Sequence, residues 1–365
     1  MNWFIVVLFI ISIILFLLTK YYLLKKKISV EEIEEFENEI KLTISEKLLK
    51  YHDIKVNYLD AEEASNLVVK DGDYLKGMNQ ANLSARNCNS IDEIYLKYKN
   101  GFDDITDNEK DTVNKFILKL MTDLKECDNS YYNYVKKWIN TISIAKAKQW
   151  LEAGMPHTLD TTIVMDANWF IKPRKTTFIH EITHVHQRQS PLDFEDLYPL
   201  LGYYYNPVDI KGLESIYPLN RNNPDGMDKY WLWHNNSSSD TKATSKTYWW
   251  IGAIFKTAVP TSLTDVNMIA LKLDKDEYIF YYLKQNPTEL SNFKEFNNFF
   301  GDNKNNYHPN EMTAKFSEWY LLQILNSIKP NDINNITHSY NNYEGYKIYK
   351  KYFENMLNVY YSIYN

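Results

Sequence analysis

The chain has 365 residues, a formal net charge of −6 and two cysteines, Cys88 and Cys127. This length is sufficient for one large domain or two smaller ones. Both signs of charge are spread along the chain, so we expect no basic face for nucleic acid. Two cysteines exclude a disulfide framework and a zinc site built from cysteines, and they leave a single disulfide bridge open.

The first 24 residues are predicted to form a transmembrane anchor. An apolar run begins at Trp3, is interrupted only by Ser12 as far as Leu18, and continues beyond Thr19 and Lys20 to residue 24. A helix of this length, at about 1.5 Å per residue, could span a bilayer core of about 30 Å. The run has no basic region before it and no small-residue cleavage site after it, which argues against a cleaved signal peptide.

The orientation of this anchor follows from its flanking charges. Lys20, Lys25, Lys26 and Lys27 lie in or after the second half of the run, and no basic residue precedes it. The positive-inside rule then predicts a single-pass membrane protein whose C-terminal domain lies on the cytoplasmic side.

Residues 25–150 are predicted to form a helical stalk and a helical N-terminal subdomain. Apolar residues near helical spacing favour a helix over residues 29–51. Thr106 and Glu109 form a capping-box pattern, which predicts that a second helix begins there. A third helix is expected over residues 131–151, because Gly and Pro residues follow it.

A short strand followed by a helix is predicted after this subdomain. Residues 161–165 are β-branched or apolar and are bounded by polar residues, as is typical of a strand. Residues 175–189 carry apolar side chains at helical period and contain no Gly or Pro. Pro173 precedes this helix, and Ser190 and Pro191 end it.

The rest of the chain is predicted to contain long loops and a terminal helix. About a hundred residues after residue 189 are rich in Tyr, Trp, Asn and Pro, and they indicate loops and short helices. Within them, the polar turn at residues 219–226 is interpreted as a structural loop. Apolar residues between positions 349 and 363 recur every three or four residues, which predicts a C-terminal amphipathic helix. The chain is therefore predicted to be α+β and mainly helical.

One motif in the helix over residues 175–189 is typical of a zinc site. The pattern His-Glu-x-x-His occupies residues 180–184. His180 and His184 are four residues apart, so their side chains lie about 40° apart on one helix face. Two imidazoles can then reach one zinc ion. Glu181 projects beside the metal, where its carboxylate can take a proton from zinc-bound water.

Together, the motif and the strand before it resemble the zincin metallopeptidases. In that family an edge strand precedes the motif helix, and the third zinc ligand comes from farther along the chain. The resemblance covers roughly residues 156–322. It implies that residues 151–365 form a zincin-like domain with a long insertion. It also implies that the strand at residues 161–165 is the edge strand that pairs with an extended peptide substrate.

The metzincin subclass does not fit the residues that follow the motif. Its pattern requires Gly and His where this chain has Gln187 and Ser190. His186 lies about 200° around the helix from His184, so we expect it at the surface or behind the ligands rather than on the metal.

A glutamate is the remaining common third ligand, and Glu311 is the predicted one. It lies between Pro309 and Ala314, which resembles the P-x-E-x-x-A helix start of several glutamate-zincins. The acid that usually follows four residues later is missing, because Lys315 occupies that position. Glu318 is expected to matter little for zinc binding. Other candidates for the third ligand remain open: Glu214, Asp225, His234 and His308.

These features predict a membrane-anchored zinc metallopeptidase that hydrolyses a bond in a peptide or protein substrate. His180, His184 and Glu311 would bind Zn²⁺, and Glu181 would be the general base. One alternative is a catalytically silent structural or interaction protein with the same fold, for example in the membrane of a large DNA virus with the domain inside the virion. The intact Glu181 argues against it. Another is a binding module with a purely structural zinc, which would normally need four protein ligands.

Overall fold

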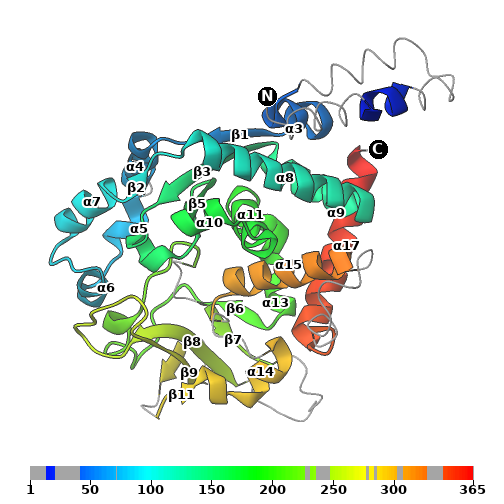
Figure 1. Ribbon diagram of the computed structural model, residues 1–365. Coiled ribbons are helices and arrows are strands. Elements are labelled where there is room, and N and C mark those ends of the chain that lie inside the picture. The colour runs from blue at the N-terminus through cyan, green and yellow to red at the C-terminus, as the bar shows by residue number, and fades with distance from the viewer. Residues whose placement is uncertain are drawn as a thin grey trace.

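The computed structural model describes residues 14–20, 42–70, 72–226, 231–235, 247–276, 279–282, 286–301, 307–326 and 340–364. In these residues the fold is α+β and mainly helical, as predicted, with two small sheets (Figure 1). No helix within these ranges is long and apolar enough to cross a membrane. Of the anchor predicted over residues 1–24, residues 14–20 are described and helical, and the other residues lie outside the described part.

The first sheet is mixed and carries the strand that precedes the motif helix. Its strand order is β1-β3-β5-β4, and β2 pairs with the end of β3. The pairs β1–β3 and β3–β5 are parallel, whereas β4 is antiparallel to β5. The strands are β1 (Lys55–Tyr58), β2 (Phe102–Asp103), β3 (Thr141–Ala147), β4 (His157–Leu159) and β5 (Thr162–Asp166).

The strand predicted over residues 161–165 is confirmed as β5, but its predicted place at the sheet edge was wrong. β5 lies between β3 and β4, so its backbone is paired on both sides. The outermost strand on this side is β4, a three-residue segment whose short length gives little periodicity to recognise in the sequence.

Helices of the N-terminal half pack beside this sheet. The capping box is confirmed at the start of α8, because the Glu109 carboxylate accepts a hydrogen bond from Thr106 N at 2.8 Å while Thr106 Oγ1 accepts from Glu109 N at 3.4 Å. Of the helix predicted over residues 29–51, the described part begins at residue 44. These helices are α3 (Ile44–His52), α4 (Ala61–Lys70), α5 (Gly72–Lys76), α6 (Gln80–Ala85), α7 (Ile91–Lys99), α8 (Asp107–Cys127) and α9 (Asn129–Ile139).

A helix over residues 131–151 was predicted wrongly in its second half. α9 ends at Ile139, and the chain continues as β3 from Thr141. The β-branched side chains of Thr141, Ile142 and Ile144 suit a strand, and parallel pairing with β1 and β5 supplies hydrogen bonds that a helix would otherwise make within itself. The partners of β3 lie far away in the sequence, so local spacing did not reveal them.

The second sheet is antiparallel and was not predicted. Its strand order is β10-β9-β8-β7-β6, and β11 pairs with β9. It is built by bulky aromatic and aliphatic residues in the region predicted to be loops and short helices, because strands pair well when such side chains pack on a pleated surface. The strands are β6 (Tyr203–Tyr205), β7 (Trp231–Trp233), β8 (Tyr248–Phe255), β9 (Val266–Asp276), β10 (Ile279–Tyr282) and β11 (Thr288–Glu289).

The helix α11 (Lys175–Gln189), as predicted, carries the motif and lies at the centre of the fold (Figure 1). It packs against β4 and β5, against α9, and against α15 (Pro309–Asn326). Every residue from 181 to 187 is buried, so this part of α11 has no side that faces solvent. α15 also contacts the predicted C-terminal helix, α17 (Glu344–Tyr364).

Short helices connect these elements. The α-helical ones are α10 (Ala167–Ile171), α12 (Leu192–Glu195), α13 (Leu197–Leu200) and α14 (Lys294–Phe300), and the 3-10 helices are η1 (Leu151–Gly154), η2 (Tyr217–Leu219) and η3 (Leu290–Asn292). The first sheet and the largest hydrophobic core cluster both contain residues from before and after position 150. Cys88 and Cys127 do not form a disulfide.

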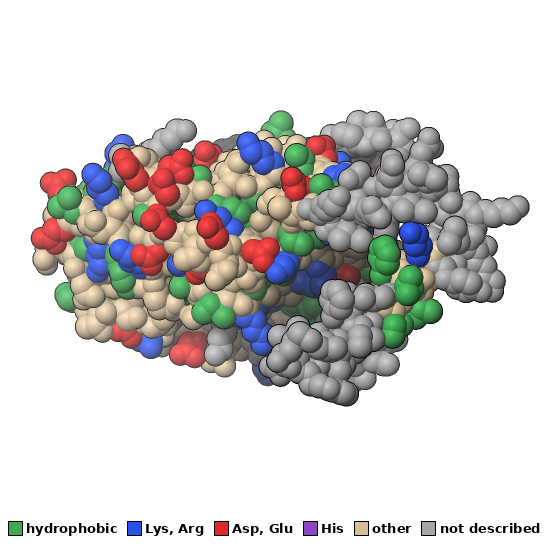
Figure 2. Space-filling view, turned by 45° about the horizontal axis from the view of Figure 1, so that its top comes forward, with side chains coloured by type: hydrophobic (Ala, Val, Ile, Leu, Met, Phe, Trp, Pro, Cys, Tyr) green, Lys and Arg blue, Asp and Glu red, His purple; other side chains and the backbone are tan. Residues whose placement is uncertain are grey.

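One face of the molecule has a mixed charge (Figure 2). Acidic and basic side chains are interspersed over the face shown in Figure 2, without an extended region of one sign. Non-specific binding to nucleic acid depends on an extended basic region, and the absence of a nucleic-acid partner stays a prediction from the composition.

Candidate metal centre

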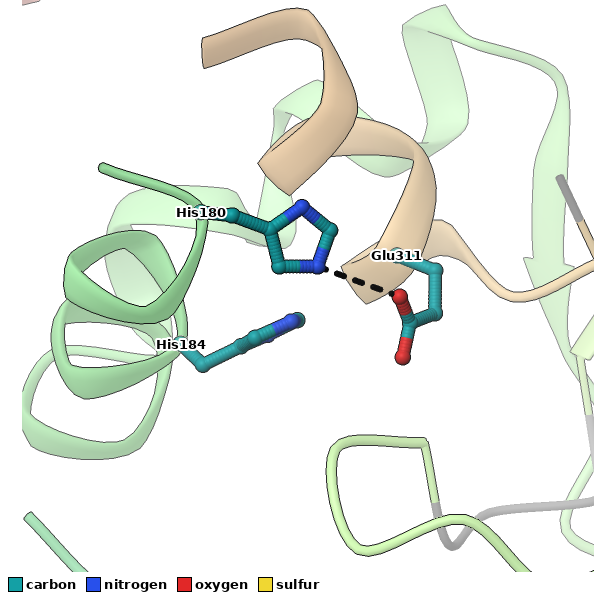
Figure 3. Close-up of side chains that lie close together, drawn as sticks. All are labelled: His180, His184 and Glu311. Carbon is teal, nitrogen blue, oxygen red and sulfur yellow. Dashed lines mark ion pairs between the residues drawn. The ribbon is translucent and has the colours of Figure 1, made fainter. Parts of the chain in front are cut away.

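Helix α11 presents His180 and His184 on one side, toward the start of α15 (Figure 3). The centroids of the two imidazole rings are 4.8 Å apart, with the ring planes at 73°. His184 is fully buried, whereas His180 keeps 18% of its side-chain surface exposed. The spacing of four residues therefore places both rings beside one point in space, as predicted.

Glu311 faces these two rings from the first turn of α15. Its Oε2 lies 3.3 Å from His180 Nε2, and one ligand atom from each of the three residues lies within 4.8 Å of the others. In the described part of the chain, this is the one group of three or more His, Cys, Asp or Glu residues with such a geometry. Ligand atoms around a tetrahedral zinc are about 3.3 Å apart. Some atoms of this cluster are farther apart than that and would move closer together on binding a zinc ion.

The chemistry of His184 fits a metal at this point. Its Nε2 is buried and has no hydrogen-bond partner among the described residues, although buried polar atoms are nearly always paired. Its Nδ1 lies 2.7 Å from Gln187 Oε1, which can only accept a hydrogen bond. Nδ1 must therefore carry the proton, and the lone pair of Nε2 is left to bind a cation.

Hydrogen bonds also hold His180 and Glu311 in place. His180 Nδ1 lies 2.8 Å from Glu318 Oε1, and Lys315 Nζ lies 2.7 Å from the other oxygen of that carboxylate. Glu318, which is expected from the sequence to matter little for zinc binding, therefore directly contacts a predicted ligand. Two turns of α15 separate it from Glu311, so both side chains reach the same histidine.

The protonation of these groups depends on their contacts. Burial alone would lower the pKa of His180, but the hydrogen bonds to Glu311 and Glu318 raise it well above its usual value. Burial would raise the pKa of Glu311, but the hydrogen bond to His180, the electrostatic interactions with His184 and His180, and the hydrogen bond from Asn223 together outweigh it and lower this pKa to about 2. Without a metal, the pair is therefore an imidazolium and a carboxylate, and a cation that binds here must displace the proton of His180.

Glu181 lies on the same helix but does not join the cluster. Its side chain is buried, and Thr158 Oγ1 in β4 donates a hydrogen bond to Glu181 Oε2 at 3.0 Å. Burial, together with the negative charge of Asp225, raises the pKa of Glu181 well above its usual value. A carboxylate with a raised pKa is a stronger proton acceptor, as a general base requires.

A turn at residues 222–226 covers this centre, and we name it the covering turn. Asn223 Nδ2 donates to Glu311 Oε1 at 2.5 Å and to Tyr307 Oη at 2.6 Å. Asp225 Oδ1 accepts a hydrogen bond from Thr158 N at 3.0 Å. The polar turn that was interpreted only as a structural loop thus contacts both a predicted ligand and the edge strand.

The outer edge of β4 is occupied by side chains. Thr158 N donates to Asp225, and Thr158 O accepts from Arg188 at 2.9 Å. Arg188 also donates to Pro224 O at 2.7 Å. A peptide that adds to β4 as a further strand must therefore displace these two side chains from Thr158.

Two cavities lie on either side of Pro224 and Asp225. The smaller, of about 230 Å³, is lined by His180, Glu181 and Glu311. The larger, of about 800 Å³, begins at His184 and extends away from the cluster. Together they provide access to the centre from two directions.

The other residues considered from the sequence are placed elsewhere. His186 is buried rather than at the surface, lies 2.8 Å from both Tyr134 Oη and Asp193 Oδ2, and stacks on Trp138 with ring centroids 4.1 Å apart. It therefore joins α11 to α9. Of the alternative third ligands, Asp225 contacts β4, His234 and His308 line the larger cavity, and Glu214 is exposed.

No protein family model matches this chain, and neither the curated proteins nor the solved structures include a detectably similar one.

Proposed function

We propose that this chain is a zinc-dependent peptidase of the zincin type. The observation that carries this proposal is the buried Nε2 of His184, which has no hydrogen-bond partner in the part of the chain that the structure describes and lies within 4.8 Å of ligand atoms of His180 and Glu311. Three protein ligands leave one position open, which is typical of a catalytic rather than a structural zinc. When bound, zinc would polarise a water molecule and lower its pKa to about 7.

The protein residues around the centre have separate roles in this proposal. Glu181 accepts the proton of the attacking water and passes it to the leaving amine. Thr158 Oγ1 donates a hydrogen bond to one oxygen of Glu181 and so restricts the rotation of this carboxylate. Glu318 and Gln187 fix the two imidazole rings through their Nδ1 atoms. A peptide is the proposed substrate because β4 is the outermost strand beside these groups and can pair with an extended chain once Asp225 and Arg188 are displaced from Thr158.

The first prediction concerns zinc content. The full-length chain, purified and dialysed against a weak chelator, should retain about one zinc per chain, because two histidines and a carboxylate complete a three-ligand site. Inductively coupled plasma mass spectrometry measures the zinc. His184→Ala should reduce the content severalfold, while His157→Ala, which removes a buried histidine that lines the smaller cavity outside the cluster, should not. A folded wild-type chain that takes up no added zinc would contradict the proposal.

The second prediction concerns Glu318, which orients His180. Glu318→Ala should weaken zinc binding by about 10- to 100-fold, as is usual when a hydrogen-bond partner of a metal-binding histidine is lost. Competition with a fluorescent zinc chelator measures the affinity. Glu318→Gln keeps an acceptor oxygen and should lose less. An unchanged affinity in the alanine variant would show that Glu318 does not support the site.

The silent alternative makes a different prediction. A structural protein that keeps this fold without turnover would bind zinc and yet cleave none of a broad set of peptides. The buried carboxylate of Glu181 beside the cluster argues against it, because a buried ionisable group without a role is costly to keep.

The membrane anchor over residues 1–24 stays a prediction that extraction of the full-length chain at alkaline pH can test.

A further inference from the structure

The larger cavity is a candidate for selecting substrate side chains. It begins at His184, where Asp225 of the covering turn separates it from the cavity that contains Glu181. Its volume of about 800 Å³ is in the range of cavities that bind small molecules or large side chains. One residue of an extended peptide advances the chain by about 3.3 Å. A peptide whose bond is attacked at the centre can therefore place the adjacent side chain in this cavity.

The lining of this cavity is aromatic. Trp231 in β7 lines it, with its ring centroid 5.2 Å from that of Tyr198 and 5.1 Å from that of Tyr205. Both ring pairs meet edge to face. Tyr203 and Tyr204 of the edge strand β6 complete this wall. Aromatic rings bind another ring or a bulky apolar group with a gain beyond simple burial.

The charges at the inner end of this cavity are already engaged. Arg188 donates to the carbonyl oxygens of Thr158 and Pro224, and Asp225 accepts from the amide of Thr158. The remaining carboxylate, that of Glu195, belongs to an exposed residue. A charged substrate side chain would thus lose water without gaining a buried partner, whereas an apolar ring would gain contacts.

We propose that this cavity selects peptides with an aromatic side chain next to the cleaved bond, with Trp231 as the residue that determines this preference. The inference rests on the proposed peptidase function and adds its substrate class. The preference arises from Trp231 and the tyrosines of β6, together with Tyr198 of α13. Of the residues that would hold zinc, only His184 lines this cavity.

Binding of two peptides tests this proposal without requiring turnover. They are a capped pentapeptide of alanine and the same peptide with phenylalanine at its third position. Isothermal titration calorimetry measures their affinity for the full-length Glu181→Gln chain and for the zinc-free chain. The phenylalanine peptide should bind at least about tenfold more tightly in both, because filling an apolar pocket gives differences of this size.

A matched pair of variants assigns the preference to the cavity. Trp231→Ala should lower the affinity for the phenylalanine peptide at least about tenfold and leave that for the alanine peptide unchanged. Trp150→Ala makes the same chemical change at a tryptophan that is 43% exposed and does not line the cavity, and it should alter neither. If Trp231→Ala does not fold by circular dichroism, Tyr205→Ser replaces it, since Tyr205 is 44% exposed.

The outcomes separate the two proposals. Equal affinity for both peptides, or a preference that survives loss of the aromatic wall, overturns the assignment of this cavity and leaves the peptidase proposal standing. A chain that binds no zinc and cleaves neither peptide overturns the peptidase proposal instead. Zinc binding and cleavage with an aromatic preference that Trp231→Ala removes supports both.

Discussion

Glu181→Gln should abolish peptide hydrolysis and leave zinc binding unchanged. The amide has nearly the same shape as the carboxylate and still accepts a hydrogen bond from Thr158 Oγ1, which lies 3.0 Å from Glu181 Oε2. It cannot take up a proton, so the attacking water loses its base. General bases contribute about 10²- to 10⁴-fold to the rate, and kcat should fall by at least that lower factor.

The control for this variant is a glutamate outside the site. Glu126 is an exposed residue near the end of α8, and Glu126→Gln makes the same change without altering the centre. Its kcat should equal that of the wild-type chain. Normal turnover in Glu181→Gln, with zinc content intact, would show that another group accepts the proton, and Asp225 would be examined next because it lies close enough to raise the pKa of Glu181.

The parts of the fold that depend on local sequence could be predicted. The capping box at Thr106 and Glu109, and the Pro residues that flank α11, act within a few residues of each other, so their spacing is visible in the chain. β3 and the second sheet could not be predicted in the same way. Their stability comes from pairing between segments far apart in sequence, and the local spacing of residues does not indicate which segments pair.

The same distinction applies to the site. His180, Glu181 and His184 share one helix, so helical geometry alone predicts that the two imidazoles lie together. Glu311 was proposed from a pattern at the start of its own helix, and the structure brings it to 3.3 Å from His180. The supporting contacts of Glu318 and Asn223 span 138 and 88 residues. Glu318 and Asn223 were missed because only tertiary packing brings them to the predicted ligands.

Glu311→Ala should weaken zinc binding by more than about 100-fold. That factor is the largest loss expected when a supporting residue such as Glu318 is removed. Two imidazoles remain in this variant, but the third ligand is lost and with it the negative charge that balances the cation. Hydrolysis should be lost in parallel. Competition with a zinc chelator measures the affinity, and circular dichroism reports whether the chain stays folded.

The alternative role of Glu311 is that of an acidic residue in the first turn of a helix, which stabilises the helix dipole by only about 0.3–1 kcal/mol. Glu344 has this position at the start of α17 and lies far from the motif in the chain, so Glu344→Ala is the matched control. It should lower the free energy of unfolding by a similar small amount and leave zinc affinity and kcat unchanged. If Glu311→Ala behaves like Glu344→Ala and keeps stoichiometric zinc, the third ligand lies elsewhere. Asp225 would then be tested first, because its carboxylate already contacts β4 beside Glu181.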